Sequence, residues 1–392
     1  MSTAPSEASR SWISRAEVLT RLRVKPQTLY AYVSRGRIAA RPDPDNPRCS
    51  LYAAEDVARL LDRSLRSAKP TASMGGAHRG EAVMETAVST LADGAFLFRG
   101  RDAVGVADSA TLEQACRVLW GADEDPFSEM KPRIDVIFPG GPRARALAAL
   151  ARRTEEDAPT TGRSDRSLRR EAASLINELV DAIAGGGPRL YLHQRLARTW
   201  KLNDAAAGLV RRALVLSADQ PLDPATLAVR VTAQTGAALA AGVLSGWAAL
   251  SGPRAAGSLA LVAAYVSEAS RASDARTAAR QRLAQGLDLP GFGDPHFPDG
   301  DPRAAALIEA ARLPAPLLDV VRVGEGLTGH KPSLDLALAL VARSLDLPRE
   351  ALFTIHAVGR TAGWLGHAIE QAQSPSPIRA RLRYVGPEPR AD

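Results

Sequence analysis

The chain has 392 residues, 45% of them hydrophobic, so it is long enough for two or three globular domains with a buried core. Its two cysteines, Cys49 and Cys116, fit neither a disulfide framework nor a metal cluster, and its polar start does not resemble a signal peptide. We therefore expect a cytoplasmic protein without a metal or cofactor. The net charge of +7 is uneven, because residues 1–70 hold 13 Lys/Arg against 7 Asp/Glu. This excess predicts a basic module for nucleic acid on a near-neutral body.

Two short helices are predicted near the start of the chain. Ser14 and Glu17 form a capping-box pattern, which predicts a helix that runs to Leu22. Pro26 suits the first position of a second helix, and Gly36 suits the position just past its end. Two short helices joined by a tight turn indicate a helix-turn-helix.

A small wing is predicted next, in the stretch "RIAARPDPDNPRCSLYAAEDVARLL". It reads as a strand, a turn, a second strand through Leu51 and Tyr52, and a helix from Ala53 or Ala54. Residues 12–65 thus resemble the winged helix-turn-helix of MerR-type regulators and excisionases.

That resemblance implies that the second helix enters the DNA major groove while the wing contacts the backbone. The residues implied to contact bases are Gln27, Thr28 and Tyr30. Those implied to contact phosphates are Lys25, Arg35, Arg37 and Arg48. Alternatively, Tyr30 and Tyr32 belong partly to the core, the arginines form a solvated face, and the module binds protein.

The rest of the chain is predicted to be helical after a linker over residues 69–82. Leu334, Leu338, Val341 and Leu345 repeat at helical spacing, and alternating runs typical of strands are few. The uncharged stretch 231–253 is long enough to cross a membrane, but its polar residues and repeated glycines favour a single buried helix packed closely on another. We therefore expect an all-α body that does not enter a membrane.

A series of segments in this body resembles the citrate synthase family over residues 85–387. The segments are "GAFLFRGRDAVGVADSATLEQACRVLWG", "ALVLSADQPLDPATLAVRVTAQTGA", "ALSGPRAAGS", "GFGDPHFPDGDPRA", "KPSLDLALAL", "AVGRTAGWLGHAIEQ" and "IRARLRYVGP". The resemblance implies an all-α dimer whose large domain (residues 83–257 and 345–392) and small domain (residues 258–344) close over oxaloacetate and acetyl-CoA. The implied reaction is a Claisen-type condensation followed by hydrolysis of the product thioester.

Carried over residue by residue, the family's active site is only partly present. The catalytic base falls on Asp335. The arginines that bind the substrate carboxylates fall on Arg303, Arg360 and Arg379, the last from the partner subunit. The three active-site histidines fall on Gln220, Ala255 and Asp294. His296, two positions after Asp294, either substitutes for a lost histidine in a shifted register or is a surface residue.

Three functions remain open. The favoured hypothesis is a regulator that binds DNA through residues 1–68 and senses a di- or tricarboxylate or an acyl-CoA with its degenerate body. The second is an active citrate or 2-methylcitrate synthase that uses Asp335 as the base. The third is a silent subunit that pairs with a competent paralogue instead of forming a homodimer. Two of these residues also have a purely structural interpretation. Arg360 could be the partner in a structural ion pair, and Asp335 could be an acid that the helix dipole favours in a first turn.

Overall fold

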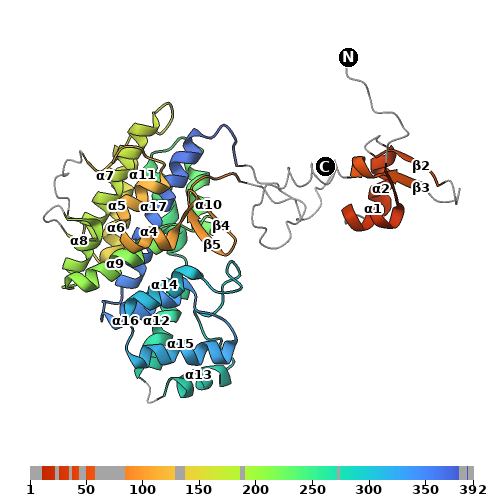
Figure 1. Cartoon of the computed structure of the whole chain (residues 1–392). Coiled ribbons are helices and arrows are strands. Elements are labelled where there is room, and N and C mark those ends of the chain that lie inside the picture. The colour runs from red at the N-terminus through yellow and green to blue at the C-terminus, as the bar shows by residue number, and fades with distance from the viewer. Residues whose placement is uncertain are drawn as a thin grey trace, which may run out of the picture. The chain divides into compact units, whose positions relative to one another are not determined.

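The computed structural model describes residues 11–22, 26–34, 38–43, 50–57, 84–128, 137–185, 190–271, 274–378 and 386. The chain divides into two compact units, residues 1–73 and residues 74–392. Both are drawn in Figure 1.

In its described residues, the N-terminal unit contains helices α1 and α2, a helical stretch over residues 54–57 and a three-stranded antiparallel sheet in the order β1-β3-β2. Its elements are β1 (Trp12–Ser14), α1 (Arg15–Leu22), α2 (Pro26–Ser34), β2 (Ala40–Pro42) and β3 (Ser50–Ala53). Helices α1 and α2 and the strand pair β2–β3 lie where the sequence predicts them, and the Ser14 hydroxyl accepts a hydrogen bond from the Glu17 amide at 3.3 Å. The winged helix-turn-helix stays a prediction. Strand β1 was not predicted, because its three residues are too few to show an alternating pattern.

This unit has a small core of its own, formed by Ile13, Val18, Leu29, Ile38, Tyr52 and Val57. Tyr32 packs against this core, whereas the Tyr30 side chain is 51% exposed and lies under the Arg15 guanidinium. Of the residues implied to contact DNA, Lys25, Arg35, Arg37 and Arg48 lie outside the described residues, and Gln27, Thr28 and Tyr30 lie on α2.

The second unit is mostly helical. Its helices are α4 (Ala103–Ser109), α5 (Leu112–Leu119), α6 (Pro142–Glu156), α7 (Asp165–Ala184), α8 (Leu192–Thr199), α9 (Asp204–Leu216), α10 (Pro224–Ala233), α11 (Leu239–Leu250), α12 (Ala256–Arg271), α13 (Ala275–Ala284), α14 (Pro302–Ala311), α15 (Ala315–Thr328), α16 (Leu334–Ser344) and α17 (Ala351–Gln373).

The all-α prediction for this unit misses one small antiparallel sheet. It consists of β4 (Ser89–Ala92), β5 (Ala95–Phe98) and β6 (Arg101–Asp102) in sequential order. Phe96 and Phe98 alternate with less buried residues along β5 and bury their rings. An alternating pattern of four residues is long enough to bury one face of a strand. It is too short to be distinguished from a helical pattern in the sequence.

Helix α17 runs through the centre of this unit, and α5, α7, α9, α10 and α11 pack around it. Figure 1 shows it in blue among the helices of the upper layer. Nineteen of its 23 residues are buried, including Trp364. Gly246 of α11 permits close packing, because an added Cβ there would lie 2.7 Å from Val229 and 3.0 Å from the Trp364 ring.

The uncharged stretch 231–253 does not form the single helix that we predicted. It contains the end of α10 and all of α11, with a break at Gly236, whose φ of +81° is incompatible with a continuous helix. Among the described residues, no helix is long and apolar enough to cross a membrane.

Helices α12 to α16 pack on one another and form a second group of helices in Figure 1. Tyr265 and Ala269 of α12 meet α13 and α15 in a separate small core that includes Val320. The division into large and small domains at residues 257 and 345 stays a prediction.

Candidate functional site

A cleft of about 570 Å³ lies where α12, α14 and α16 meet α17 and the turn after α9. Residues from six places line it: the turn between α9 and α10, the start of α12 with the turn before it, the loop 291–296, and the beginnings of α14, α16 and α17. Most of these places are helix ends or turns, where polar backbone and side-chain groups are free to face a ligand.

Two glycines set the position of α17 at this cleft. An added Cβ on Gly359 would lie 2.7 Å from the Leu214 carbonyl oxygen of α9, and one on Gly363 would collide with the Asp219 carboxylate. The Gly363 amide also donates a hydrogen bond to the Ala218 carbonyl oxygen at 2.8 Å. This close approach brings Arg360, which lies between the two glycines, against the turn that follows α9.

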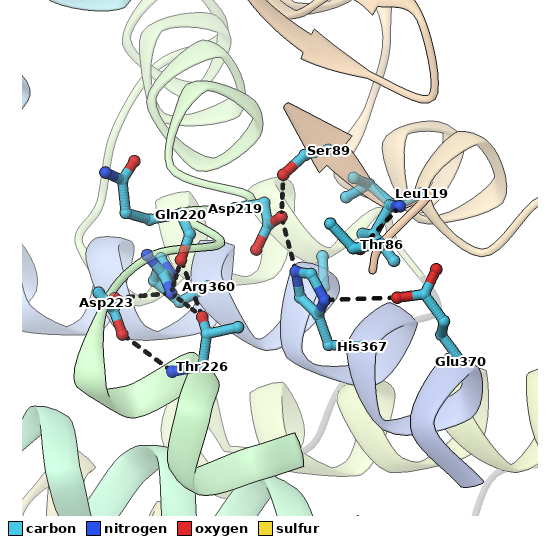
Figure 2. Close-up of polar contacts among 12 residues, drawn as sticks. Thr86, Ser89, Leu119, Asp219, Gln220, Asp223, Thr226, Arg360, His367 and Glu370 are labelled. Atoms are coloured by element: carbon cyan, nitrogen blue, oxygen red, sulfur yellow. Dashed lines mark hydrogen bonds and ion pairs between the residues drawn. The ribbon is translucent and has the colours of Figure 1, made fainter. Parts of the chain in front are cut away.

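Arg360 is buried and contacts that turn through its Nη2 (Figure 2). Its Nη2 lies 2.7 Å from a carboxylate oxygen of Asp223 and donates to the Thr226 hydroxyl at 2.7 Å and to the Gln220 carbonyl oxygen at 3.1 Å. Asp223 is also the N-cap of α10, since it accepts a hydrogen bond from the Thr226 amide. The guanidinium charge is therefore balanced by a carboxylate of the same chain.

Arg303 is paired in a similar way. Its Nε and Nη2 donate to the two carboxylate oxygens of Asp301 at 3.0 and 2.9 Å, and Nη2 also lies 3.3 Å from the side-chain oxygen of Gln220. The guanidinium lies 4.3 Å from the centre of the Phe96 ring and 5.0 Å from that of Phe297. The aromatic rings and Asp301 thus hold Arg303 rigidly at the cleft wall.

Asp335 and His356 lie close together in the cleft. Asp335 lies in the first turn of α16, where Ser333 is the N-cap, and its Oδ1 is 3.9 Å from His356 Nδ1. Burial and the nearby charge of Asp294 raise the pKa of Asp335 to about 6. Burial lowers the pKa of His356 to about 3, and the charges of Arg360 and Arg303 act in the same direction. His356 is therefore a neutral imidazole at neutral pH.

A second imidazole enters the cleft from the loop 291–296. This loop is fixed to the start of α16 by hydrogen bonds from the Gly293 amide to the Lys331 carbonyl and from the Ser333 amide to the Gly291 carbonyl. Asp294 Oδ1 lies 2.9 Å from His296 Nδ1 and accepts the His296 amide at 2.8 Å. His296 lies in the cleft, with its side chain 31% exposed.

Behind the cleft, a buried polar network connects three distant segments (Figure 2). Asp219 accepts a hydrogen bond from the Ser89 hydroxyl at 2.5 Å and lies 3.0 Å from His367 Nε2. Burial opposes the charge on Asp219, but the interaction with His367 outweighs it, so the pKa of Asp219 is lowered to about 2. Glu370, within 4.0 Å of the other His367 ring nitrogen, pairs with Arg230 at 2.7 Å.

Five of the predicted body residues come together in the cleft, namely Gln220, Asp294, Arg303, Asp335 and Arg360. Ala255 is not among the lining residues and packs partly against the core, while its neighbour Arg254 does line the cleft. Arg379 lies outside the described residues. No group of three or more His, Cys, Asp or Glu residues in the described part of the chain is arranged to hold a metal ion.

The lining residues that sequence reasoning missed include Asp223, Arg254 and His356. His356 carried a usable signal, since it lies four residues before Arg360 and therefore on the same face of α17. Asp223 carried no such signal, because an aspartate directly before Pro224 is already accounted for as the N-cap of a helix.

The chain matches the family description "Citrate synthase, C-terminal domain" over residues 142–381. It is 34% identical over 189 residues to the Putative citrate synthase 2 of Mycobacterium tuberculosis, an alignment that covers 45% of this chain and 51% of that protein. It thus spans about half the length of the curated relatives that it matches first.

Two solved structures share the fold. The citrate synthase of Thermotoga maritima MSB8 superposes with a TM-score of 0.63 at 19% identity, over 80% of this chain and 96% of that one. The citrate synthase of Thermoplasma acidophilum, in a ternary complex with carboxymethyl coenzyme A and oxaloacetate, gives a TM-score of 0.60 at 18% identity, over 79% of this chain and 95% of that one.

Proposed function

Since the chain belongs to the citrate synthase family, we propose that its body catalyses the condensation of an acyl thioester with a 2-oxo acid. The observation that carries this proposal is the approach of Asp335 to the neutral imidazole of His356 in a cleft that two buried arginines also line. A carboxylate base and a neutral hydrogen-bond donor at one point suit the removal of a proton next to a carbonyl group.

In the proposed reaction Asp335 takes a proton from the carbon next to the thioester carbonyl. A base with a pKa of about 6 is ionised at neutral pH and is stronger than an ordinary aspartate. The electron pair of the broken C–H bond moves toward the thioester oxygen. His356, which is uncharged, is the donor that we propose for this developing oxyanion.

The second imidazole serves the acceptor carbonyl in this proposal. The enol carbon attacks the carbonyl carbon of the 2-oxo acid, a carbon–carbon bond forms, and the carbonyl oxygen gains a proton. His296 is the proposed proton donor, because it lies in the cleft and Asp294 Oδ1 holds its Nδ1 at 2.9 Å. Water then hydrolyses the product thioester and releases the thiol.

The test separates proton removal from the complete reaction. The exchange of acyl methyl protons of acetyl-CoA in D2O is followed by NMR with a panel of 2-oxo acids, and thiol release is measured in parallel. We expect exchange and thiol release with at least one acid and loss of both in Asp335→Asn. If the wild type exchanges no faster than Asp335→Asn while ligands still bind, the body is a sensor and not an enzyme.

For the N-terminal unit we propose sequence-specific DNA binding. Two short helices in succession are followed by an antiparallel strand pair, and residues 1–70, with 13 Lys/Arg against 7 Asp/Glu, carry +6 of the net charge of +7. The exposed Tyr30 on α2 is the described side chain best placed to reach a base. This function is compatible with an active body and would make the protein a metabolite-responsive regulator.

DNA binding is tested by selection from a random-sequence DNA pool with the full chain. We expect an enriched motif, affinity that falls steeply with salt, and relaxed specificity in Tyr30→Ala. Titration of the selected DNA with and without the 2-oxo acid then tests regulation. The absence of any enriched motif would exclude a sequence-specific module.

A further inference from the structure

We propose that a second groove of the body binds the anion of a fatty acid, with the alkyl chain on its floor and the carboxylate at its rim. The groove has a volume of about 650 Å³, which lies within the range of small-molecule sites. It is formed by the first turns of α6 and α17, by α12, by the second half of α16 and by residues 346–350, which join α16 to α17. It shares three helices with the cleft but none of the residues that line the cleft.

The floor of this groove is apolar and made largely of small side chains. Alanines of α12 and α16, two helices that pack on each other, lie between larger apolar side chains. The apolar lining residues are Leu259, Ala260, Ala263, Ala264, Ala339, Ala342, Leu347, Pro348, Leu352 and Phe353. These side chains offer no hydrogen bonds, so a hydrocarbon chain that covers them is stabilised by the apolar surface that both remove from water.

The rim of the groove is positively charged. Four arginines line it, namely Arg143, Arg271, Arg343 and Arg349. Among the described residues, Arg343 alone of these four has a carboxylate partner, Asp346, at 3.4 Å. The Asp346 side chain is 95% exposed, so this ion pair is weak. Glu350 is the other acid of the lining, and the four arginines therefore exceed the two acids and favour an anionic ligand.

The lining suits an alkyl chain better than the base of a nucleotide. The Phe353 ring is 9% exposed, with the Arg143 guanidinium 5.2 Å from its centre and the Trp247 ring against it at 5.7 Å, so it has no open face on which a base could stack. Ser267 is the one neutral hydrogen-bonding side chain in the described lining, and its hydroxyl already accepts a hydrogen bond from Arg271. The groove thus lacks the groups that would recognise the polar edge of a base.

The experiment is a calorimetric titration of the full chain with octanoate, decanoate and dodecanoate, each below the concentration at which it forms micelles. We expect a single site per chain and an affinity that rises about tenfold for each pair of added CH₂ groups, because burial of one CH₂ contributes a factor of about four. Decanol, which has the chain without the charge, should bind at least about tenfold more weakly than decanoate.

Two tryptophan variants locate the binding site. Ala264 is an exposed residue of α12 that lines the groove, so Ala264→Trp fills the groove from the surface and should abolish dodecanoate binding. Leu261→Trp is the matched control, because Leu261 lies on the same helix, is 54% exposed and lines neither the groove nor the cleft. It should bind dodecanoate as the wild type does.

Arginine variants test the rim independently of the floor. Arg143→Gln and Arg271→Gln should each weaken dodecanoate binding about tenfold, whereas Arg322→Gln, at an exposed arginine of α15 that does not line the groove, should change nothing. The proposal is overturned if dodecanoate does not bind, if its affinity is the same as that of octanoate, or if Ala264→Trp binds it undiminished. Binding of ATP that is tighter than that of dodecanoate and is lost in Ala264→Trp would replace the fatty acid by a polyphosphate.

Discussion

Nδ1 of His356 lies 3.9 Å from Oδ1 of Asp335, although the two residues belong to different helices. Burial pushes each of them toward its neutral form, which raises the pKa of the acid and lowers that of the imidazole. The two groups thus have pKa values of about 6 and about 3. Above pH 6, Asp335 is an anionic base and His356 remains an uncharged donor.

The first prediction concerns the pH dependence of proton exchange. Asp335 must be ionised to act as a base, so the exchange rate should rise with pH, with a midpoint near 6, and level off above it. Asp294→Asn removes a neighbouring negative charge, which lowers the pKa of Asp335 and moves the midpoint to lower pH. Both profiles are obtained from NMR exchange rates measured from about pH 4.5 to about pH 8, in steps of about half a pH unit. A midpoint that does not move in Asp294→Asn would contradict the assigned interaction.

The second prediction concerns His356. Loss of a donor to a developing oxyanion costs about 10²- to 10³-fold in kcat, so His356→Gln should lose activity on this scale with a much smaller change in KM. His330→Gln is the matched control, since His330 is exposed and does not line the cleft. Steady-state thiol release measures both variants. Equal activity of the two would show that His356 takes no part.

The third prediction concerns the fit of α17 against the turn after α9. Gly363→Ala places a methyl group against the Asp219 carboxylate and the Ala218 carbonyl oxygen, so it should lower the free energy of unfolding by about 2–4 kcal/mol. Gly326→Ala in α15 meets nothing within 4 Å and should stabilise the protein slightly. Urea unfolding of the two variants checks the difference. A tolerated Gly363→Ala would mean that the helices separate at little cost.

The fourth prediction concerns Asp219. Its folded-state pKa of about 2 lies below the ordinary value of 3.8, so its ionised form stabilises the fold at pH 7 by about 2 kcal/mol. This contribution is fully present above pH 4 and is lost as the pH falls toward 2.

Asp219→Asn should therefore destabilise the protein by about 2 kcal/mol at pH 7 and by much less near about pH 2.5. Asp299→Asn, which changes an exposed aspartate, provides the control for the loss of one charge. Denaturation curves across this range measure the effect. A destabilisation that stays constant with pH would point to lost packing and not to the ion pair.

The fold and much of the cleft could be predicted from local patterns. Helical spacing located α16, and motif positions located Asp335, Arg303 and Arg360, which do meet in the cleft. The prediction of a single helix over residues 231–253 was wrong, because the sequence pattern does not show that Gly236 adopts a positive φ.

The pairings inside the cleft could not be predicted in the same way. Asp223 and Arg360 are 137 positions apart, and nothing in either local sequence indicates that they form an ion pair. The sequence therefore predicted three arginines available for carboxylates, whereas the structure shows that Arg303 and Arg360 are already neutralised. Charge balance is a tertiary property, and local sequence patterns do not show it.

The central place of α17 has a consequence for biosynthesis. This helix is formed by residues 351–373, yet α5, α7, α9, α10 and α11 all pack on it. During translation those earlier helices leave the ribosome before their common partner has been made. Their apolar faces then remain open until α17 emerges, so the core of the body cannot close before residue 373 has been made.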